Sequence, residues 1–405
     1  MNPGFNTELE RRLDKIHSDG LLRVLRRIDS PQTTSIQLAG QTCLNFSSND
    51  YLGLANDPRL KQAAKQAIDQ FGAGSGASRL ICGSLTPHAD LESALRRFKQ
   101  CEAALTFSSG YAAAVGTICA LLDKEDVIIV DRLVHASIID AARLCGAKMR
   151  VFDHNDLGSL KELLTWARGR ISPTPGRTPQ TLVVTESVFS MDGDVAPLAG
   201  IVELKEQFGA WLMVDEAHGT GVFGSQRRGA VEEAGISGRV EIQMGTLGKA
   251  LGSAGGFICG SQVLVDYLVN RARSFIFSTA PVPAASAAAS AAIQIVQSEE
   301  GVQLATQLWR LVERLTTRLR EDGWNLGPTR SPIIPIILGD ESTAVSTANS
   351  LRERGIFIPA IRYPSVARGQ ARLRLTLSAS HTDQDLDHLI DALIELRGLN
   401  SHSQQ

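Results

Sequence analysis

The chain has 405 residues, a formal net charge of −2 and a pI near 6.5. This length exceeds the size at which a single hydrophobic core stops growing, so we expect two or three structural units. The near-neutral charge, with Lys and Arg scattered along the sequence, argues against a nucleic-acid or anionic-membrane surface. Small, discrete substrates are the better expectation.

The spacing of the cysteines and the composition of the N-terminal residues indicate where in the cell the protein works. The six cysteines are widely spaced and form no C-x-x-C pair, which argues against a zinc site and against a disulfide framework. Residues 1–20 are charged and contain no apolar stretch of the signal-peptide type, and no run reaches roughly eighteen apolar residues. We therefore expect a cytoplasmic protein with no metal site and no membrane span.

The N-terminal region predicts an arm, not a domain. Five apolar residues follow helical spacing in the first thirty positions, namely Leu9, Leu13, Ile16, Leu22 and Leu25. This pattern predicts an amphipathic helix, and the segment QLAGQTCLNFS after it predicts a short β segment. We assign residues 1–55 to this helical arm and β segment.

Residues 56–290 predict a central α/β domain. Apolar strand-like runs alternate there with helical ones; the runs are AALTF, DVIIVD, TLVVTE and WLMVDEAHG, and helices are expected from Tyr111 and Ala136. Nearly continuously apolar strands that alternate with helices predict a mostly parallel sheet covered on both faces. The segment SPTPGRTPQ, residues 172–180, predicts an exposed loop within this domain.

The remaining residues, 291–405, predict a smaller α+β domain. The Ala-rich segment AASAAASAAIQIVQ predicts a long helix that leads into it. Strand-like runs follow in SPIIPIIL and ARLRLTL.

A lysine and an acidic strand end carry the strongest chemical signal. Lys249 lies in GTLGKALGSAGG, where five glycines within twelve residues permit close approach of the backbone to a ligand. The apolar run WLMV ends at Asp215, followed by His218, and a carboxylate there is costly to bury without a cationic partner. An amine that forms a Schiff base and a carboxylate that keeps a ring nitrogen protonated are what a pyridoxal 5'-phosphate enzyme needs.

Further polar residues follow the other apolar runs, where ligands bind in open α/β sheets. Gly110 and Tyr111 open a helix after AALTF, so their N–H groups can receive a phosphate, or the adjacent serine can simply cap the helix. His135 can stack on a cofactor ring or cap the next helix. Ser190 precedes the turn MDGD and can touch a cofactor or serve only the turn. Thr246 offers a hydroxyl near Lys249.

Motifs from end to end of the chain resemble those of the α-oxoamine synthases. They are SSNDYLGL, SSGYAAA, DRLVHAS, ESVFSMDGD, VDEAHGTG, TLGKALG, FSTA and ARLRLTLSASH. The resemblance covers residues from Leu13 to the C-terminal helix. It implies an α/β protein of fold-type I, a pyridoxal-phosphate-dependent acyltransferase with a large, mostly parallel sheet domain and a smaller α+β C-terminal domain.

The resemblance also assigns roles at the cofactor. It implies that Lys249 carries the cofactor, that Asp215 pairs with its ring nitrogen and that His218 contacts its ring hydroxyl. His135 stacks on the ring, and these four residues form the expected catalytic set. The further cofactor contacts implied by the resemblance are Gly110, Tyr111, Ser190, Thr246 and Thr279, the last donated across a homodimer interface.

On the substrate side, the resemblance places Arg23 and Asn49 near an acyl thioester, with His135 beside them. Ser365 stands where the family often has threonine, and the exchange keeps the hydroxyl. Arg372 resembles the arginine that binds the amino-acid carboxylate, and Arg362 is a second candidate. For either arginine the alternative is a structural ion pair.

Within the family, the chain is most similar to members that condense L-alanine with a pimeloyl thioester carried by coenzyme A or, transiently, by an acyl carrier protein. One alternative is a member that uses glycine and acetyl-CoA, or serine and a long acyl chain. Another is a catalytically silent partner subunit, against which Lys249, Asp215 and His218 argue. A fold-type I aminotransferase is the third, and the acyl-side motifs argue against it.

Overall fold

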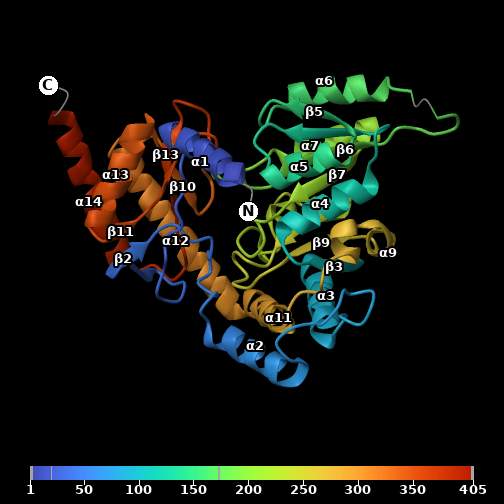
Figure 1. Cartoon of the computed structure of the whole chain (residues 1–405), viewed down its shortest axis with the longest axis horizontal. Helices are drawn as coiled ribbons and strands as arrows, with labels where there is room; N and C mark the ends of the chain where they lie inside the picture. Colours follow the sequence, from blue (N-terminus) through green and yellow to red (C-terminus); the bar gives the residue numbers. More distant parts are fainter. Residues whose placement is uncertain (1–2, 20, 172–173, 403–405) are drawn as a thin grey trace.

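A computed structural model describes residues 3–19, 21–171 and 174–402 of the chain (Figure 1). Its largest sheet has seven strands in the order β3-β9-β8-β7-β6-β4-β5. Strand β9 runs opposite to the other six strands, so the sheet is mostly parallel, as the sequence predicts. In that order the strands are Ala103–Phe107, Gly256–Gly260, Ile242–Thr246, Trp211–Asp215, Thr181–Glu186, Val127–Asp131 and Lys148–Phe152.

Helices bury both faces of this sheet. Along β7, Leu212 and Val214 belong to one hydrophobic cluster and Met213 to another, because successive strand residues point to opposite faces. The helices of the first cluster include α3 (Thr86–Lys99), α6 (Leu157–Arg168), α7 (Leu198–Phe208) and α11 (Pro283–Gln297). The helices of the second are α4 (Gly110–Leu121), α5 (Ala136–Leu144), α9 (Gln262–Arg271) and α10 (Arg273–Ile276). Two buried faces explain the uninterrupted apolar runs.

The last part of the chain builds a second, smaller layer of helices and strands (Figure 1). Its antiparallel sheet has the order β10-β13-β12, with strands Ile333–Gly339, Ala371–Thr376 and Ala360–Ile361. Its helices are α12 (Glu299–Glu321), α13 (Glu341–Glu353) and α14 (Asp383–His402). The two strand-like runs predicted here are both strands.

The N-terminal β segment joins this C-terminal part. Strands β1 (Ser35–Leu38) and β2 (Gln41–Asn45) form a hairpin, and β11 (Ile356–Phe357) adds to β2 in parallel. The remaining elements are α2 (Pro58–Phe71), the short α8 (Ala230–Glu233) and a 3-10 turn at Ser237–Arg239. The division at residues 55 and 290 stays a prediction; residue 290 lies within α11.

The N-terminal helix is shorter than the apolar pattern predicts. Helix α1 (Pro3–Ser18) ends before Leu22 and Leu25, and the side chain of Leu25 is fully exposed. Ile16 and Leu22 are six residues apart, so the helical spacing fails between them. The predicted loop is irregular from residue 174 to 180; Ser172 and Pro173 lie outside the described residues. No helix in the described ranges is long and apolar enough to span a membrane.

Candidate active site

Acidic side chains mark the carboxyl ends of neighbouring central strands. Asp215 ends β7 and Glu186 ends β6, and the two residues are directly paired in the parallel register. Both side chains are buried, and one carboxyl oxygen of Glu186 has no hydrogen-bond partner. Burial raises the pKa of both carboxyl groups, and the charge of Asp215 raises that of Glu186 further. A nearby cation is therefore needed to keep a carboxylate ionised at these strand ends.

Lys249 and His218 lie together above these carboxylates. Lys249 Nζ is 2.7 Å from Nε2 of His218, and Nδ1 of His218 is 2.6 Å from the hydroxyl of Tyr51. Burial lowers the pKa of Lys249 to about 8, against the attraction of Asp215 and Glu186. Burial and the positive charge of Lys249 hold the pKa of His218 well below its usual range. The amine is thus available as a nucleophile near neutral pH, beside a neutral imidazole.

His135 caps a helix and also presents its ring to the site. Its Nδ1 accepts a hydrogen bond from the N–H of Ser137 at the start of α5, and the Ser137 hydroxyl lies 2.8 Å away. The residue keeps part of its surface exposed. Partial desolvation of the ring lowers the pKa of His135, and the charges of Asp215 and Lys249 act on it in opposite directions. The two functions weighed from the sequence are compatible in one residue, because capping uses only one ring nitrogen.

The N-terminus of α4 forms a cradle of backbone N–H groups. Ser109 caps the helix by accepting from Ala112, which leaves the N–H groups of Gly110 and Tyr111 without a partner in the helix. A Cβ on Gly256 would come within 2.6 Å of the Gly110 nitrogen, so this glycine lets β9 approach the helix end. Thr246 lies beside Gly110 across this gap. The site can receive an anion.

Two arginines of β13 reach different targets. Arg374 donates to the carbonyl of Ser190 and, at 3.1 Å, to Oδ1 of Asn49, and its charge acts on both Lys249 and His218. Arg372, two residues earlier, forms an ion pair with Asp192 and donates to the Gln370 carbonyl. Arg374 is therefore the arginine in the Lys249 site, whereas Arg372 is held in a structural ion pair.

Several residues predicted for the site lie outside this cluster. Arg23, Ser365 and Thr279 are exposed, and Thr279 forms an isolated bridge with Ser78. Arg362 lines a separate surface cavity with Arg26 and Arg352. Tyr111 is half exposed and donates through its hydroxyl to Asp140. Asn49 and Ser190, by contrast, reach the cluster through Arg374.

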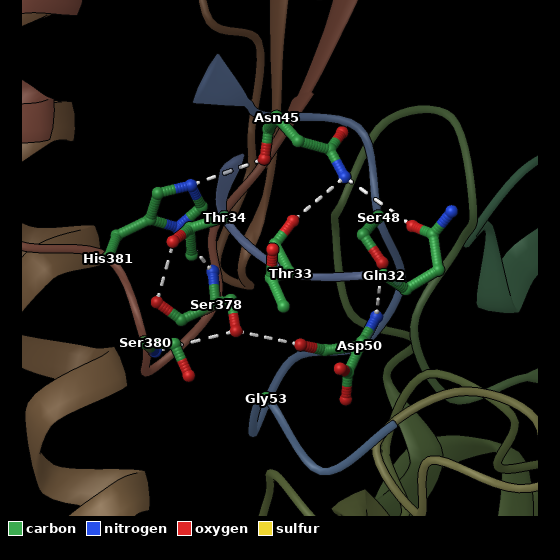
Figure 2. Close-up of a pocket in the computed structure, with 10 residues that line it drawn as sticks. All are labelled: Gln32, Thr33, Thr34, Asn45, Ser48, Asp50, Gly53, Ser378, Ser380 and His381. Carbon is green, nitrogen blue, oxygen red and sulfur yellow. Dashed lines mark hydrogen bonds between the residues drawn. The ribbon is translucent and has the colours of Figure 1, made fainter. Parts of the chain in front are cut away.

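A polar cavity is lined in part by Ser48, Asp50 and Gly53, which belong to the same loop as Asn49 and Tyr51 (Figure 2). Its walls come from segments far apart in the sequence, and the Ser378 hydroxyl donates to the backbone carbonyl of Asp50 at 2.8 Å. His381 donates across the cavity to the carbonyl of Asn45. The carboxylate of Asp50 accepts from the N–H groups of Leu54 and Ala55. These contacts fix the loop.

Sequence reasoning missed three residues of the site. Tyr51 stands in the motif SSNDYLGL, and Glu186 begins ESVFSMDGD, so both lay within recognised segments. Arg374 lies on the same strand face as Arg372, since they are two residues apart. The alternation of the strand shows that both arginines share a face, but the partner of each depends on the loop that carries Ser190 and Asp192.

The donor set fits pyridoxal 5'-phosphate. A lysine amine with lowered pKa matches its aldehyde, and the buried carboxylate of Asp215 matches a protonated ring nitrogen. The glycine cradle at the α4 N-terminus, with Thr246 beside it, matches its phosphate. The unpaired Glu186 oxygen shows that the strand ends carry more acceptor capacity than the chain itself satisfies.

Comparison with known proteins agrees with this chemistry. The profile of the family described as "Aminotransferase class I and II" matches residues 41–393. The 8-amino-7-oxononanoate synthase of Geotalea daltonii is 45% identical over 94% of this chain and 95% of its own length. Curated relatives with the same name from Geobacter sulfurreducens and Bacillus pumilus are 44% and 42% identical.

Solved structures extend the similarity to the fold and the cofactor. The serine palmitoyltransferase of Sphingomonas wittichii superposes with a TM-score of 0.89 at 32% identity, covering 99% of this chain and 98% of that one. A serine palmitoyltransferase from S. paucimobilis, solved with PLP and myriocin bound, gives 0.88 at 28% identity over 96% of each chain. The predicted fold class and cofactor are confirmed. The chain therefore belongs to the α-oxoamine synthases, the pyridoxal-phosphate-dependent acyltransferases within the class I and II aminotransferase family.

Proposed function

We propose that this enzyme condenses L-alanine with a pimeloyl thioester and releases carbon dioxide and the thiol, which yields 8-amino-7-oxononanoate, an intermediate of biotin synthesis. The observation that carries the proposal is the near full-length identity of 41–46% with proteins of that name, on a chain that keeps the complete Lys249 site. The cofactor, when bound, supplies an electron sink that stabilises negative charge on the α-carbon of the amino acid.

The cofactor-binding residues we propose are those at the strand ends and the α4 N-terminus. Lys249 holds the aldehyde carbon, Asp215 the ring nitrogen and His218 the ring hydroxyl, while His135 covers one face of the ring. The phosphate lies at the N–H groups of Gly110 and Tyr111. Thr246 and Ser190 complete the contacts.

Two residues act on the amino acid. Arg374 binds the carboxylate of alanine, because its guanidinium lies in the Lys249 site. Arg362 remains a second candidate for this role. When alanine takes the place of Lys249 at the cofactor, the freed Lys249 amine removes the α-proton of alanine and later returns a proton. The pKa of Lys249, about 8, suits an acid–base group near neutral pH.

The thioester side is proposed to include Arg23, Asn49 and Ser365, whereas Thr279 of a second copy is proposed to contact the cofactor phosphate. Exposed apolar side chains lie near Thr279 in the sequence and near Ser78, which is bridged to it; they are Phe277, Val282, Leu80 and Ile81. Apolar side chains gathered in this way are typical of an interface. We propose a homodimer here, and Phe277→Asp should convert a dimer to a monomer in light scattering; a monomeric wild-type chain would contradict it.

Thiol release tests the function directly. The purified, cofactor-loaded enzyme is offered L-alanine, glycine and L-serine against pimeloyl, acetyl and palmitoyl thioesters of coenzyme A, and pimeloyl-acyl carrier protein. We expect thiol release only when L-alanine is combined with a pimeloyl thioester. The carrier that supports the faster release, coenzyme A or acyl carrier protein, identifies the physiological donor. A preference for glycine with acetyl-CoA would overturn the proposal.

A second candidate, a serine-using long-chain synthase, is favoured by the TM-score of 0.89 with serine palmitoyltransferase. That score reports the course of the backbone, whereas substrate choice depends on side chains. Identity is 32% with that enzyme and 45% with the Geotalea synthase, so the alanine and pimeloyl reaction is the first choice.

A further inference from the structure

The hydroxyl of Tyr51 occupies an unusual position between the two halves of the site. Tyr51 is fully buried, and its oxygen lies 2.6 Å from Nδ1 of His218 and 3.2 Å from Oδ1 of Asn49. Arg374 hydrogen-bonds to the same tyrosine. Tyr51 therefore contacts His218, which faces Lys249, and Arg374, which is proposed to bind the substrate carboxylate.

We propose that Tyr51 is a positioning residue that donates its hydroxyl proton to Nδ1 of His218 and so keeps the single imidazole proton of His218 on Nε2, facing Lys249. The inference rests on the proposed role of Lys249 as the residue that carries the cofactor. It does not depend on which acyl group the enzyme transfers.

The distances favour one direction for the hydrogen bond. An O–H donor prefers about 2.5–3.0 Å. The hydroxyl of Tyr51 has one proton; Nδ1 of His218 lies 2.6 Å from its oxygen, whereas Oδ1 of Asn49 lies 3.2 Å away and also accepts from Arg374. The shorter contact favours His218 as the acceptor of the tyrosine proton.

The charge states support the same arrangement. Burial raises the pKa of Tyr51 to about 12, so the hydroxyl keeps its proton. Burial and the nearby charges of Lys249 and Arg374 keep His218 neutral, so it carries one proton and exists as one of two tautomers. With Nδ1 accepting, Nε2 must donate, and its partner at 2.7 Å is the Lys249 amine. An N–H donor at Nε2 of His218 favours the neutral form of the Lys249 amine. When the cofactor is bound, the same N–H would donate to the anionic oxygen of its ring hydroxyl.

The backbone around Tyr51 is held firmly enough to set this geometry. Its carbonyl accepts from the N–H of Ala379, and the Asp50 carbonyl before it accepts from the Ser378 hydroxyl (Figure 2). The tyrosine ring is tilted against the His218 ring with centroids 6.0 Å apart. These contacts hold the hydroxyl within hydrogen-bonding distance of Nδ1 of His218.

The test measures how fast cofactor-free protein captures pyridoxal 5'-phosphate as pH varies, since capture needs the neutral Lys249 amine. The groups that face this amine are Asp215, Glu186, His218, His135 and Arg374. Wild-type capture should have its midpoint near pH 8. In Tyr51→Phe, His218 is free to accept from a Lys249 ammonium, so the midpoint should rise by about one unit, the equivalent of one net hydrogen bond.

Two comparisons separate positioning from a general loss of structure. Tyr267→Phe, at a partly exposed tyrosine of α9, should leave the midpoint unchanged. In a His218→Gln background, which has no tautomers, Tyr51→Phe should add no further shift. An unshifted midpoint in Tyr51→Phe, or an equal shift with and without His218, would overturn the proposal.

The wild-type holoenzyme offers a measurement that needs no variant at Tyr51. Nitrogen-15 NMR of labelled histidines, with the His218 signals assigned by their loss in His218→Gln, should show a protonated Nε2 and an unprotonated Nδ1. The opposite tautomer would refute the inference even if Tyr51→Phe failed to fold. Normal cofactor capture without thiol release would instead count against the proposed reaction alone.

Discussion

The cofactor side and the thioester side of the site are built in different ways. Asp215 and His218 are each 5% exposed and lie at the ends of a sheet buried on both faces. Arg23 and Ser365, on the thioester side, are exposed in turns or irregular segments of the single chain. Buried groups with fixed partners have shifted pKa values and defined geometry, whereas exposed groups gain fixed partners only when a substrate or a second subunit binds. The cofactor side is therefore preorganised by folding, and the thioester side depends on binding.

Replacement of Lys249 by alanine tests the preorganised side most severely. Turnover should fall by roughly a thousandfold or more, because the amine both holds the cofactor and moves the α-proton. Borohydride treatment of the wild type should attach the cofactor to the peptide that contains Lys249, and the variant should lose this product. Lys61→Ala, at an exposed lysine of α2, is the matched control. Substantial turnover by pure Lys249→Ala would remove the basis of the assignment.

The paired arginines of β13 give the next largest effect. Arg374→Ala should raise the KM for alanine by about ten- to a hundredfold, the value of a charge-assisted hydrogen bond to a carboxylate. Arg372→Ala should leave this KM within about threefold of wild type and lower the melting temperature instead, because it breaks the ion pair with Asp192. If Arg372→Ala alone raised the KM for alanine, the resemblance-based assignment of Arg372 would be right.

A half-buried histidine should make the stability of the cofactor side depend on pH. His154 lies 2.9 Å from Asp131 of β4 and 2.8 Å from Asp194, in the loop that carries Ser190. Desolvation opposes protonation of His154, but hydrogen bonds to the two carboxylates outweigh it and raise its pKa to about 10. Because the folded pKa exceeds the unfolded one, the stabilisation is complete below pH 6.5 and is lost as pH rises toward 10.

Thermal unfolding across this pH range checks the prediction. The melting temperature of the wild type should fall more between neutral pH and pH 10 than that of His154→Gln, whose side chain does not titrate. The two curves should converge at the alkaline end. Parallel curves would mean that the carboxylates do not hold the histidine in its charged form.

The smallest effect is expected on the thioester side. Ser365→Ala should raise the KM for the pimeloyl thioester by about threefold, the value of one exposed, neutral hydrogen bond. The KM for alanine and the absorbance of bound cofactor should not change, because Ser365 is exposed and makes no side-chain contact with the Lys249 cluster in the described residues. A changed cofactor spectrum would show that the two sides are less separate than we describe.

Local sequence patterns predicted the sheet and its chemistry because both depend on short segments. Continuous apolar runs identified the central strands. Asp215 at the end of one of them and Lys249 among glycines together indicated the cofactor chemistry. The apolar pattern misled only at the N-terminus, where the spacing between Ile16 and Leu22 does not fit a helix that continues past Ser18.

The sequence by itself thus determined the fold class, the cofactor and the position of Asp215 at a strand end, since strand periodicity and residue chemistry are local properties. Only the tertiary structure decided that Arg374 bonds Asn49 near Lys249, that Tyr51 bonds His218 and that Glu186 lies beside Asp215. Each of these contacts joins segments separated by tens or hundreds of residues. Their partners follow from strand register and loop packing, which arise only when the whole chain is folded.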